Sequence, residues 1–171
     1  MGKIVIVGSG PAGCSAALYA ARAGQEVVVI SMGMGALSKA ELIQNYYGFE
    51  EGITGAELYR RGVAGAKAVG AEFITAEVVG LDYTGSLVVQ TTEGDYPADA
   101  VILATGAGRI APKIAGLAEH EGRGVSYCAT CDAFFYRGKT AAVLGSGEYA
   151  LHEVQALLPL AGKVILCTNG E

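Results

Sequence analysis

The chain has 171 residues, of which 51% are hydrophobic, and its formal net charge at pH 7 is −5. This length allows one complete domain, or one domain and part of a second. The acidic balance and the lack of a basic cluster argue against nucleic acid as a partner, and no apolar run is long enough to cross a membrane. The N-terminus lacks a signal-peptide pattern, so we expect a cytoplasmic protein.

The first thirty residues predict a strand–helix–strand unit. Apolar runs at 3–7 (KIVIV) and 26–30 (EVVVI) are typical of parallel strands covered on both faces, and 14–23 is an Ala-rich helix pattern. The turn before the helix reads GSGPAG at 8–13. A G-x-G-x-x-G turn in this context binds the pyrophosphate of a dinucleotide. Ser31 stands where such folds usually carry a ribose-binding acid, and it can still form a hydrogen bond there.

The middle of the chain predicts further α/β structure. Residues 33–55 form a long connection, a length that usually carries function. The pattern then predicts a helix over 56–69, alternating strands over 72–81 and 87–92, and a buried strand over 100–104. Gly and Pro residues between 108 and 124 indicate a domain boundary, or a surface loop within one domain. We place the domains at 1–112 and 113–171.

The first pattern returns near the end of the chain. Strands are predicted over 140–144 and 163–167, with a helix over 151–160 between them. The turn between strand and helix reads GSGEYA at 145–150, a G-x-G-x-x-A form of the dinucleotide turn.

Cys128 and Cys131 are separated by two residues, and Asp132 follows them. A C-x-x-C pair forms a disulfide that opens and closes reversibly. In a reducing compartment the alternatives are half of a zinc site or a structural pair. Cys14 and Cys167 lie in apolar helix and strand patterns, so we expect both to be buried and unreactive. Because neither is placed to complete a zinc site, we expect no metal.

These motifs together resemble the low-molecular-weight thioredoxin reductase family. The resemblance covers essentially the whole chain and rests on GSGPAG at 8–13, ATGA at 104–107, GRGVSYCATCDAFFYRGK at 122–139 and the turn at 145–150. It implies an α/β fold, with a three-layer Rossmann-like FAD-binding domain and part of an inserted, second Rossmann-like domain that carries the CxxC motif. It also implies a flavoprotein oxidoreductase that acts on thioredoxin or a similar protein, and a homodimer.

The resemblance further assigns roles to individual residues. Cys131 is expected to be the thiol that faces the flavin, and Cys128 the thiol that attacks the partner disulfide. Asp132 is expected to protonate the leaving thiolate, a role that requires burial of its carboxyl group; the alternative is a plain helix-start carboxylate. The residues expected to bind FAD are Gly8, Gly10, Pro11, Ala12, Gly13, Ser31, Asn45, Thr105 and Gly106.

Two departures from the family concern the electron donor. NADPH-dependent members carry adjacent arginines after the second strand of the inserted domain, whereas residues 167–171 of this chain read CTNGE. In addition, Glu148 and Tyr149 stand in the glycine turn at 145–150. The connection after Ser31 also lacks the Gly-Gly-Gln of those members. A dianionic phosphate binds poorly without a cationic partner. The chain therefore resembles the branch reduced by ferredoxin; NADPH, or NADH with Glu171 on the ribose, is the alternative donor.

The family returns to the FAD domain after the inserted domain, and this chain does not. Its last predicted strand would be an exposed parallel edge, which folded proteins avoid. We therefore expect a fragment of a longer protein. A truncated nucleotide-binding module without turnover is the alternative function.

Overall fold

A computed structural model describes residues 1–108 and 111–170. The chain divides into two compact units, Met1–Ala111 and Pro112–Glu171, and each is described by itself.

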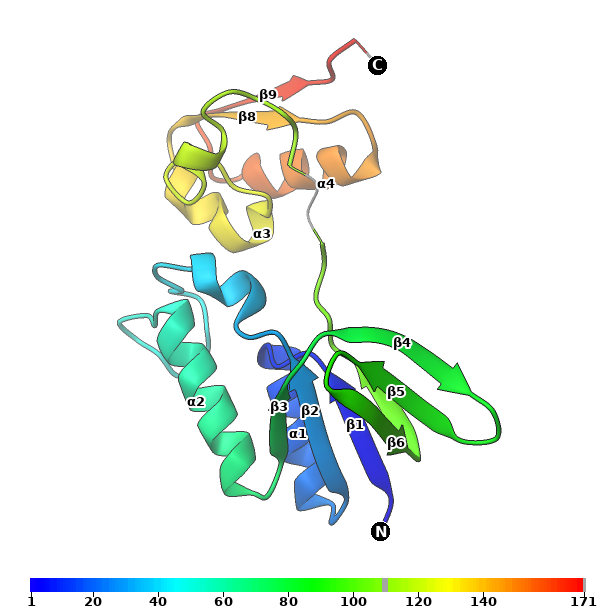
Figure 1. Ribbon diagram of the computed structural model, residues 1–171. Helices are drawn as coiled ribbons and strands as arrows, with labels where there is room; N and C mark the ends of the chain where they lie inside the picture. Colours follow the sequence, from blue (N-terminus) through cyan, green and yellow to red (C-terminus); the bar gives the residue numbers. More distant parts are fainter. Residues whose placement is uncertain (109–110, 171) are drawn as a thin grey trace. The chain divides into compact units, whose positions relative to one another are not determined.

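The first unit is built on a parallel sheet with the strand order β3-β2-β1-β7 (Figure 1). The register places Val5 of the central strand β1 opposite Val28 of β2 and Val101 of β7. Both apolar runs predicted near the N-terminus are therefore strands, as expected. The four strands are β1 (Lys3–Val7), β2 (Glu26–Ser31), β3 (Glu72–Thr75) and β7 (Ala100–Leu103).

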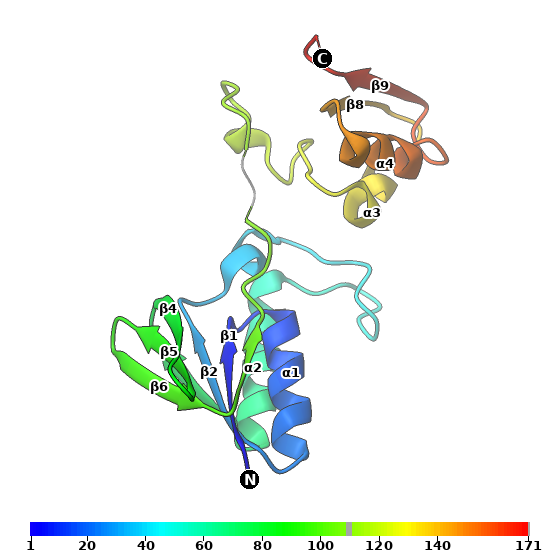
Figure 2. The same cartoon turned by 90° about the vertical axis from the view of Figure 1, so that its right-hand side faces the viewer.

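Different elements cover the two faces of this sheet (Figure 2). One face packs against α1 (Pro11–Arg22) and α2 (Gly55–Ala68), and the other against the antiparallel sheet of β4 (Val78–Tyr83), β5 (Leu87–Thr91) and β6 (Gly94–Ala98). Since neighbouring residues of a strand point to opposite faces, Ile6 packs on the helix side, and Val5 and Val7 on the other. This confirms the predicted three-layer α/β fold.

Two strand predictions are wrong in detail. The segment predicted as one strand over 72–81 is two strands, because the chain leaves the parallel sheet after Thr75 and enters the antiparallel sheet at Val78. The segment predicted as a buried strand over 100–104 forms β7, but this strand is not buried, since its Ile102 and Leu103 are 36% and 64% exposed. It ends the strand order of the described sheet, so only β1 pairs with it.

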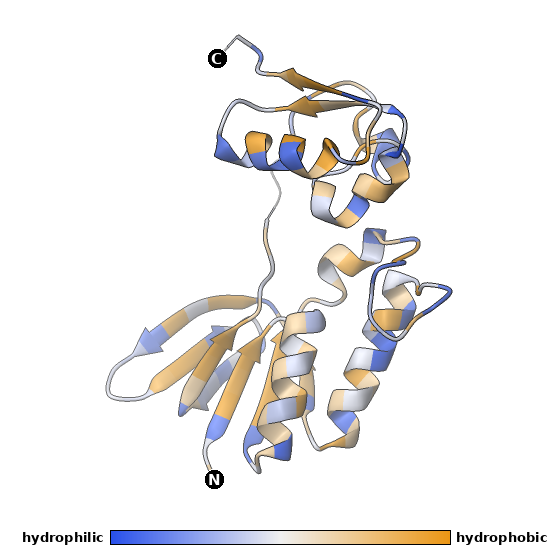
Figure 3. Ribbon diagram, turned by 180° about the vertical axis from the view of Figure 1, so that it is seen from behind, coloured by the Kyte–Doolittle hydropathy of each residue, from blue (hydrophilic) through white to orange (hydrophobic). Residues whose placement is uncertain are grey.

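The second unit pairs β8 (Thr140–Leu144) with β9 (Lys163–Cys167) in parallel, with Ala142 opposite Ile165. The helix α4 (Glu148–Leu157) connects these strands, and the short helices α3 (Ala129–Asp132) and η3 (Ala133–Tyr136) pack against it. Figure 3 shows both strands as predominantly hydrophobic. The core of this unit consists of Ala129, Ala133, Ala141 and Leu157.

Two further 3-10 helices, η1 (Gly35–Lys39) and η2 (Ala118–His120), lie in the connecting segments. Within the described part of the chain, no helix has the length and apolar character needed to cross a membrane.

Candidate functional site

The first glycine turn joins β1 to α1 at the carboxyl edge of the parallel sheet. Gly8 has φ +107°, and a Cβ there would lie 2.2 Å from the carbonyl oxygen of Ala104. A Cβ on Gly13 would lie 1.9 Å from the carbonyl oxygen of Gly8. Both positions therefore require glycine, Gly8 for the turn and Gly13 for the close approach of α1 to the strand end.

Gly10 differs from these two glycines because its missing side chain leaves open space. No atom lies within 4 Å of a Cβ built there. Gly10 is the N-cap of α1, no side chain caps this helix start, Pro11 follows, and the first turn holds no acidic residue. The positive end of the helix dipole, which includes Ala12, is therefore available to an anion. A dinucleotide pyrophosphate fits this arrangement.

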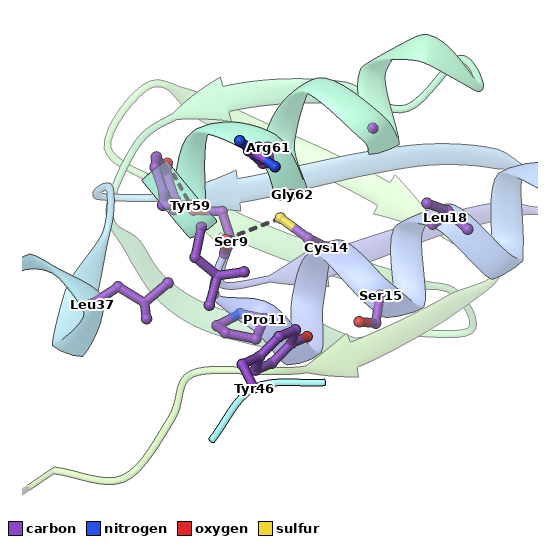
Figure 4. A pocket seen from close by; sticks show the side chains of 13 residues that line it. Ser9, Pro11, Cys14, Ser15, Leu18, Leu37, Tyr46, Tyr59, Arg61 and Gly62 are labelled. Carbon is purple, nitrogen blue, oxygen red and sulfur yellow. Dashed lines mark hydrogen bonds between the residues drawn. The ribbon is translucent and has the colours of Figure 1, made fainter. Parts of the chain in front are cut away.

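A cavity of about 130 Å³ lies beside this turn (Figure 4). Tyr46 and Leu37 bring the long connection 33–55 to it, so part of that connection does approach the glycine turn. Asn45, which precedes Tyr46, is exposed. The other lining residues are Ser9, Gly10, Pro11, Cys14, Ser15, Leu18, Leu58, Tyr59, Arg61, Gly62 and Gly65.

Ser31 ends β2 at the same sheet edge and donates a hydrogen bond to Oγ of the buried Ser9, at 2.7 Å. The Ser9 hydroxyl in turn donates to the carbonyl of Gly33 at 3.3 Å and lies 3.1 Å from the Tyr59 hydroxyl. Ser31 can therefore accept a hydrogen bond from a ribose hydroxyl, while its own proton is used within the protein. Sequence reasoning missed Ser9 and Tyr59, since only the fold brings α2 to the end of β2.

Thr105 and Gly106 follow β7, whose Leu103 pairs with Val7 of β1. The amide of Ala104 donates to the carbonyl of Val7 at 2.8 Å, and Gly106 has φ +74°. The fold thus brings Thr105 and Gly106 to the sheet edge that carries the glycine turn and Ser31.

Cys14 and Cys167 differ in exposure. Cys14 is buried and its Sγ donates to the carbonyl of Ser9 at 3.1 Å, and burial raises the pKa of this thiol. The prediction of a buried Cys14 is confirmed, and its lack of reactivity stays a prediction. The prediction for Cys167 is wrong, because it is exposed on β9, which pairs only with β8 in the described sheet.

Cys128 and Cys131 form a disulfide, with their Cα atoms 5.3 Å apart. Cys128 is the N-cap of α3, and the amide of Cys131 donates to Cys128 Sγ at 3.2 Å. Cys128 is half-buried and Cys131 is exposed. The two cysteines therefore differ in exposure, and the sulfur of Cys128 has a backbone donor from the helix start directed at it.

Ser126 connects Asp132 to the disulfide turn. Its hydroxyl donates to Oδ2 of Asp132 at 2.5 Å and accepts the amide hydrogen of Cys128 at 3.1 Å. Asp132 is half-buried and ends α3, whose N-cap is Cys128. Burial raises the pKa of Tyr136, and the negative charge of Asp132 raises it further. The carboxylate thus lies within the disulfide turn, and Asp132 is also the N-cap of η3, where its side chain forms no capping hydrogen bond.

Helix α4 brings two side chains to this turn. Tyr149 donates its hydroxyl to the carbonyl of Tyr127 at 3.0 Å, and the carboxylate of Glu153 accepts the amide hydrogen of Ala129. Sequence reasoning did not find Glu153, because it lies 24 residues from Ala129 and belongs to no motif.

The second glycine turn differs from the first in charge. Gly147 caps α4 without a side-chain bond, but Glu148 lies in the first helical turn and opposes an anion there. A cleft of about 370 Å³ opens beside this turn, at the carboxyl ends of β8 and β9. Lys113 lines it, a cation that sequence reasoning missed because it precedes the turn by more than thirty residues. The other lining residues are Pro112, Ile114, Leu144, Gly145, Ser146, Thr168 and Asn169.

Glu171, the candidate ribose acid of an NADH user, lies outside the described residues. Within residues 1–108 and 111–170, no group of three or more His, Cys, Asp and Glu side chains is arranged to hold a metal ion.

The chain is similar in sequence and fold to known proteins over nearly its whole length. A bifunctional thioredoxin reductase/thioredoxin of Mycobacterium leprae is 44% identical over 169 residues, which are 96% of this chain and 37% of that protein. The structure of a thioredoxin reductase from Streptococcus pyogenes is 37% identical with a TM-score of 0.87 over 95% of this chain and 54% of that one. An atypical thioredoxin reductase from Desulfovibrio vulgaris is 42% identical with a TM-score of 0.60, over 100% of this chain and 58% of that one.

The chain spans about half the length of most of the curated relatives it matches, for example 53% of the thioredoxin reductase of Aquifex aeolicus. A family model described as pyridine nucleotide-disulphide oxidoreductase matches residues 2–169. The chain therefore belongs to the pyridine nucleotide-disulphide oxidoreductase family, whose thioredoxin reductases are FAD flavoproteins.

Proposed function

We propose that the protein carrying this chain is a flavin-dependent thioredoxin-disulfide reductase. The observation that carries the proposal is the Cys128–Cys131 disulfide at the start of α3, with the Asp132 carboxylate held in the same turn by Ser126. The names of the relatives and the family match support the same activity.

The first glycine turn is the proposed site of FAD. Gly8 and Gly13 bring α1 close to the strand end, and Gly10 leaves room for the pyrophosphate at the helix start. Pro11 and Ala12 complete the first turn of this helix, and Ser31, Asn45, Thr105 and Gly106 are the remaining proposed contacts. When bound, FAD supplies the two electrons that open the disulfide.

Thiol–disulfide exchange then accounts for reduction of thioredoxin. The thiolate of Cys128 attacks one sulfur of the substrate disulfide, so a mixed disulfide forms as the substrate S–S bond breaks. The thiolate of Cys131 then attacks Cys128 Sγ, which restores the Cys128–Cys131 disulfide and releases the second substrate sulfur. The substrate gains two electrons and two protons, and the protein's reduced cysteine pair loses the same two electrons and two protons as it closes to the disulfide.

Cys128 suits the attacking role because the amide of Cys131 points at its sulfur, and a hydrogen bond of this kind stabilises a thiolate. Asp132 is the proposed acid for the leaving thiolate. Ser126 orients its carboxyl group from within the same turn.

Ferredoxin is the proposed electron donor. The described residues after β9, 168–170, carry no cation for a 2′-phosphate, and Glu148 places a negative charge at the second turn. One observation favours NADPH as a second candidate: Lys113 lines the cleft at this turn. Transfer of two electrons from ferredoxin requires two single-electron steps, whereas NADPH would deliver a hydride.

The remaining features of the proposal are a homodimeric, cytoplasmic protein and a division into an FAD-binding part at 1–112 and a disulfide-bearing part at 113–171. The resemblance to thioredoxin reductases supports the first, and the two compact units support the second.

The test is made on the complete protein. It is expected to purify with flavin absorbance and to reduce thioredoxin with reduced ferredoxin, and this turnover should disappear in Cys128→Ser. A protein that binds no flavin, or that reduces no protein disulfide with ferredoxin, NADPH or NADH, would contradict the proposal.

A further inference from the structure

Glu153 lies on α4 and reaches the disulfide turn from outside it. Its carboxylate accepts the amide hydrogen of Ala129, the residue that follows Cys128 and begins α3. The Glu153 side chain is only 13% exposed. A carboxylate with little contact with water therefore lies next to the redox-active pair.

This position has a definite electrostatic effect. The free amides at a helix start stabilise a neighbouring thiolate, and nearby negative charge disfavours it. Here the Cys131 amide is directed at Cys128 Sγ, but Glu153 occupies the Ala129 amide and adds a negative charge of its own. Because Glu153 is largely buried, solvent screens this charge less than it would screen an exposed one.

We propose that Glu153 is a positioning residue that holds the disulfide turn and disfavours the thiolate form of the reduced Cys128 and Cys131 pair, which makes the pair a stronger reductant. A dithiol whose reduced form is less stable gives up its two electrons and two protons more readily as it closes to the disulfide. This role rests on the proposed disulfide reductase function, and it names the group that adjusts the driving force.

Other titratable groups lie on α4 and on the elements packed against it. His152 Nδ1 lies 3.7 Å from Glu153 Oε1, and a protonated His152 would offset the charge of Glu153. The elements packed against α4 contribute Asp132 on α3, Tyr136 on η3, and Lys163 and Cys167 on β9. The comparison is therefore made between variants of Glu153 at the same pH, with all these groups unchanged.

The first measurement is the pH dependence of alkylation. The complete protein is reduced with dithiothreitol, desalted and treated with iodoacetamide between pH 6 and pH 10, and the peptide containing Cys128 and Cys131 is followed by mass spectrometry. In Glu153→Gln, which keeps the shape and an acceptor oxygen, the apparent thiol pKa is expected to fall by about one unit, with alkylation at pH 7 about threefold faster. Glu153→Asp, which keeps the charge, is expected to behave like the parent.

The second measurement is the equilibrium of the pair with dithiothreitol at pH 8, above the ordinary titration range of histidine. Glu153→Gln is expected to shift the equilibrium about threefold toward the dithiol. Glu119→Gln, which removes an exposed carboxylate on η2, is the matched control and should leave both measurements unchanged. Glu153→Met is the second uncharged variant if Glu153→Gln does not fold.

Parent-like values in both uncharged variants would overturn the role of Glu153, as would equal shifts in Glu153→Asp and Glu153→Gln. Neither measurement uses ferredoxin, NADPH, NADH or thioredoxin. Failure of the proposed reductase activity would therefore leave the result intact, and failure here would leave that activity intact.

Discussion

The hydroxyl of Tyr149 donates a hydrogen bond to the backbone carbonyl of Tyr127, at 3.0 Å. Tyr149 lies in the first turn of α4, beside the second glycine turn, and Tyr127 immediately precedes Cys128. This bond connects the glycine turn to the disulfide turn. The large side chain of Tyr149 therefore has a structural contact of its own.

Tyr149→Phe is expected to lower the free energy of unfolding by about 0.5 to 1 kcal/mol, since it removes one hydrogen bond from an exposed side chain. Amide hydrogen exchange should increase at residues 127–132, and urea unfolding followed by circular dichroism gives the stability. Tyr136→Phe is the matched control, because it removes the tyrosine–carbonyl bond to Gly124, at 3.1 Å. If Tyr149→Phe and Tyr136→Phe changed exchange at 127–132 equally, the connection to the disulfide turn would be wrong.

Alanine substitutions at Gly10 and Gly13 should separate cofactor binding from folding. Gly13→Ala places a Cβ 1.9 Å from the Gly8 carbonyl oxygen and should destabilise the fold by about 3 kcal/mol. Gly10→Ala meets no protein atom within 4 Å, so the fold should keep its stability while the added methyl group occupies the place of the pyrophosphate. Flavin absorbance of the purified protein and its thermal unfolding measure the two effects. Undiminished flavin binding in Gly10→Ala would show that the cofactor lies elsewhere.

Single cysteine substitutions distinguish the roles of the two thiols. Cys131→Ser should leave flavin bound and abolish multiple turnover, because the mixed disulfide cannot be resolved within the pair. Cys128→Ser should prevent formation of the mixed disulfide with thioredoxin at all. Trapping with a thioredoxin that lacks its own resolving cysteine, followed by non-reducing electrophoresis, measures this difference. A mixed disulfide formed by Cys128→Ser and not by Cys131→Ser would reverse the assignment.

Rapid mixing tests the electron donor and the role of Lys113 together. Flavin reduction should be fast with reduced ferredoxin and slow or absent with NADPH, and Lys113→Ala should leave the ferredoxin rate unchanged. If NADPH reduced the flavin rapidly and Lys113→Ala weakened its binding about tenfold or more, Lys113 would supply the phosphate contact and NADPH would be the donor. Lys139→Ala, which removes another exposed lysine of the same unit, is the control.

Burial of Cys14 predicts a pH dependence of stability. Because its thiol pKa is raised above the ordinary value of 9.0, the unfolded chain loses this proton first as the pH rises. The stabilisation is therefore fully present below about pH 9 and is lost as the pH rises through the folded-state pKa. The difference in urea unfolding between the parent and Cys14→Ala should shrink from pH 7 to pH 10. Cys167, which is exposed, should react with iodoacetamide in the folded protein while Cys14 does not; equal reactivity would contradict this account.

Local patterns determined much of this protein from the sequence alone. The apolar runs 3–7, 140–144 and 163–167 are strands with the predicted bounds, because a parallel strand covered by other elements needs a continuous run of apolar residues. The glycine turns and the disulfide of the C-x-x-C motif were also predictable from the sequence. A turn conformation or a short covalent link depends on residues that are neighbours in the chain.

Only the tertiary structure decided the contacts between distant segments. The exposure of Cys167 depends on which strands pair with β9, and the split of 72–81 depends on two different sheets receiving its two halves. Glu153 at the Ala129 amide and Lys113 at the second turn have no signal in their own neighbourhoods. A carboxylate or an ammonium acts on whatever the fold brings within a few ångströms, and that distance is set by packing rather than by position in the chain.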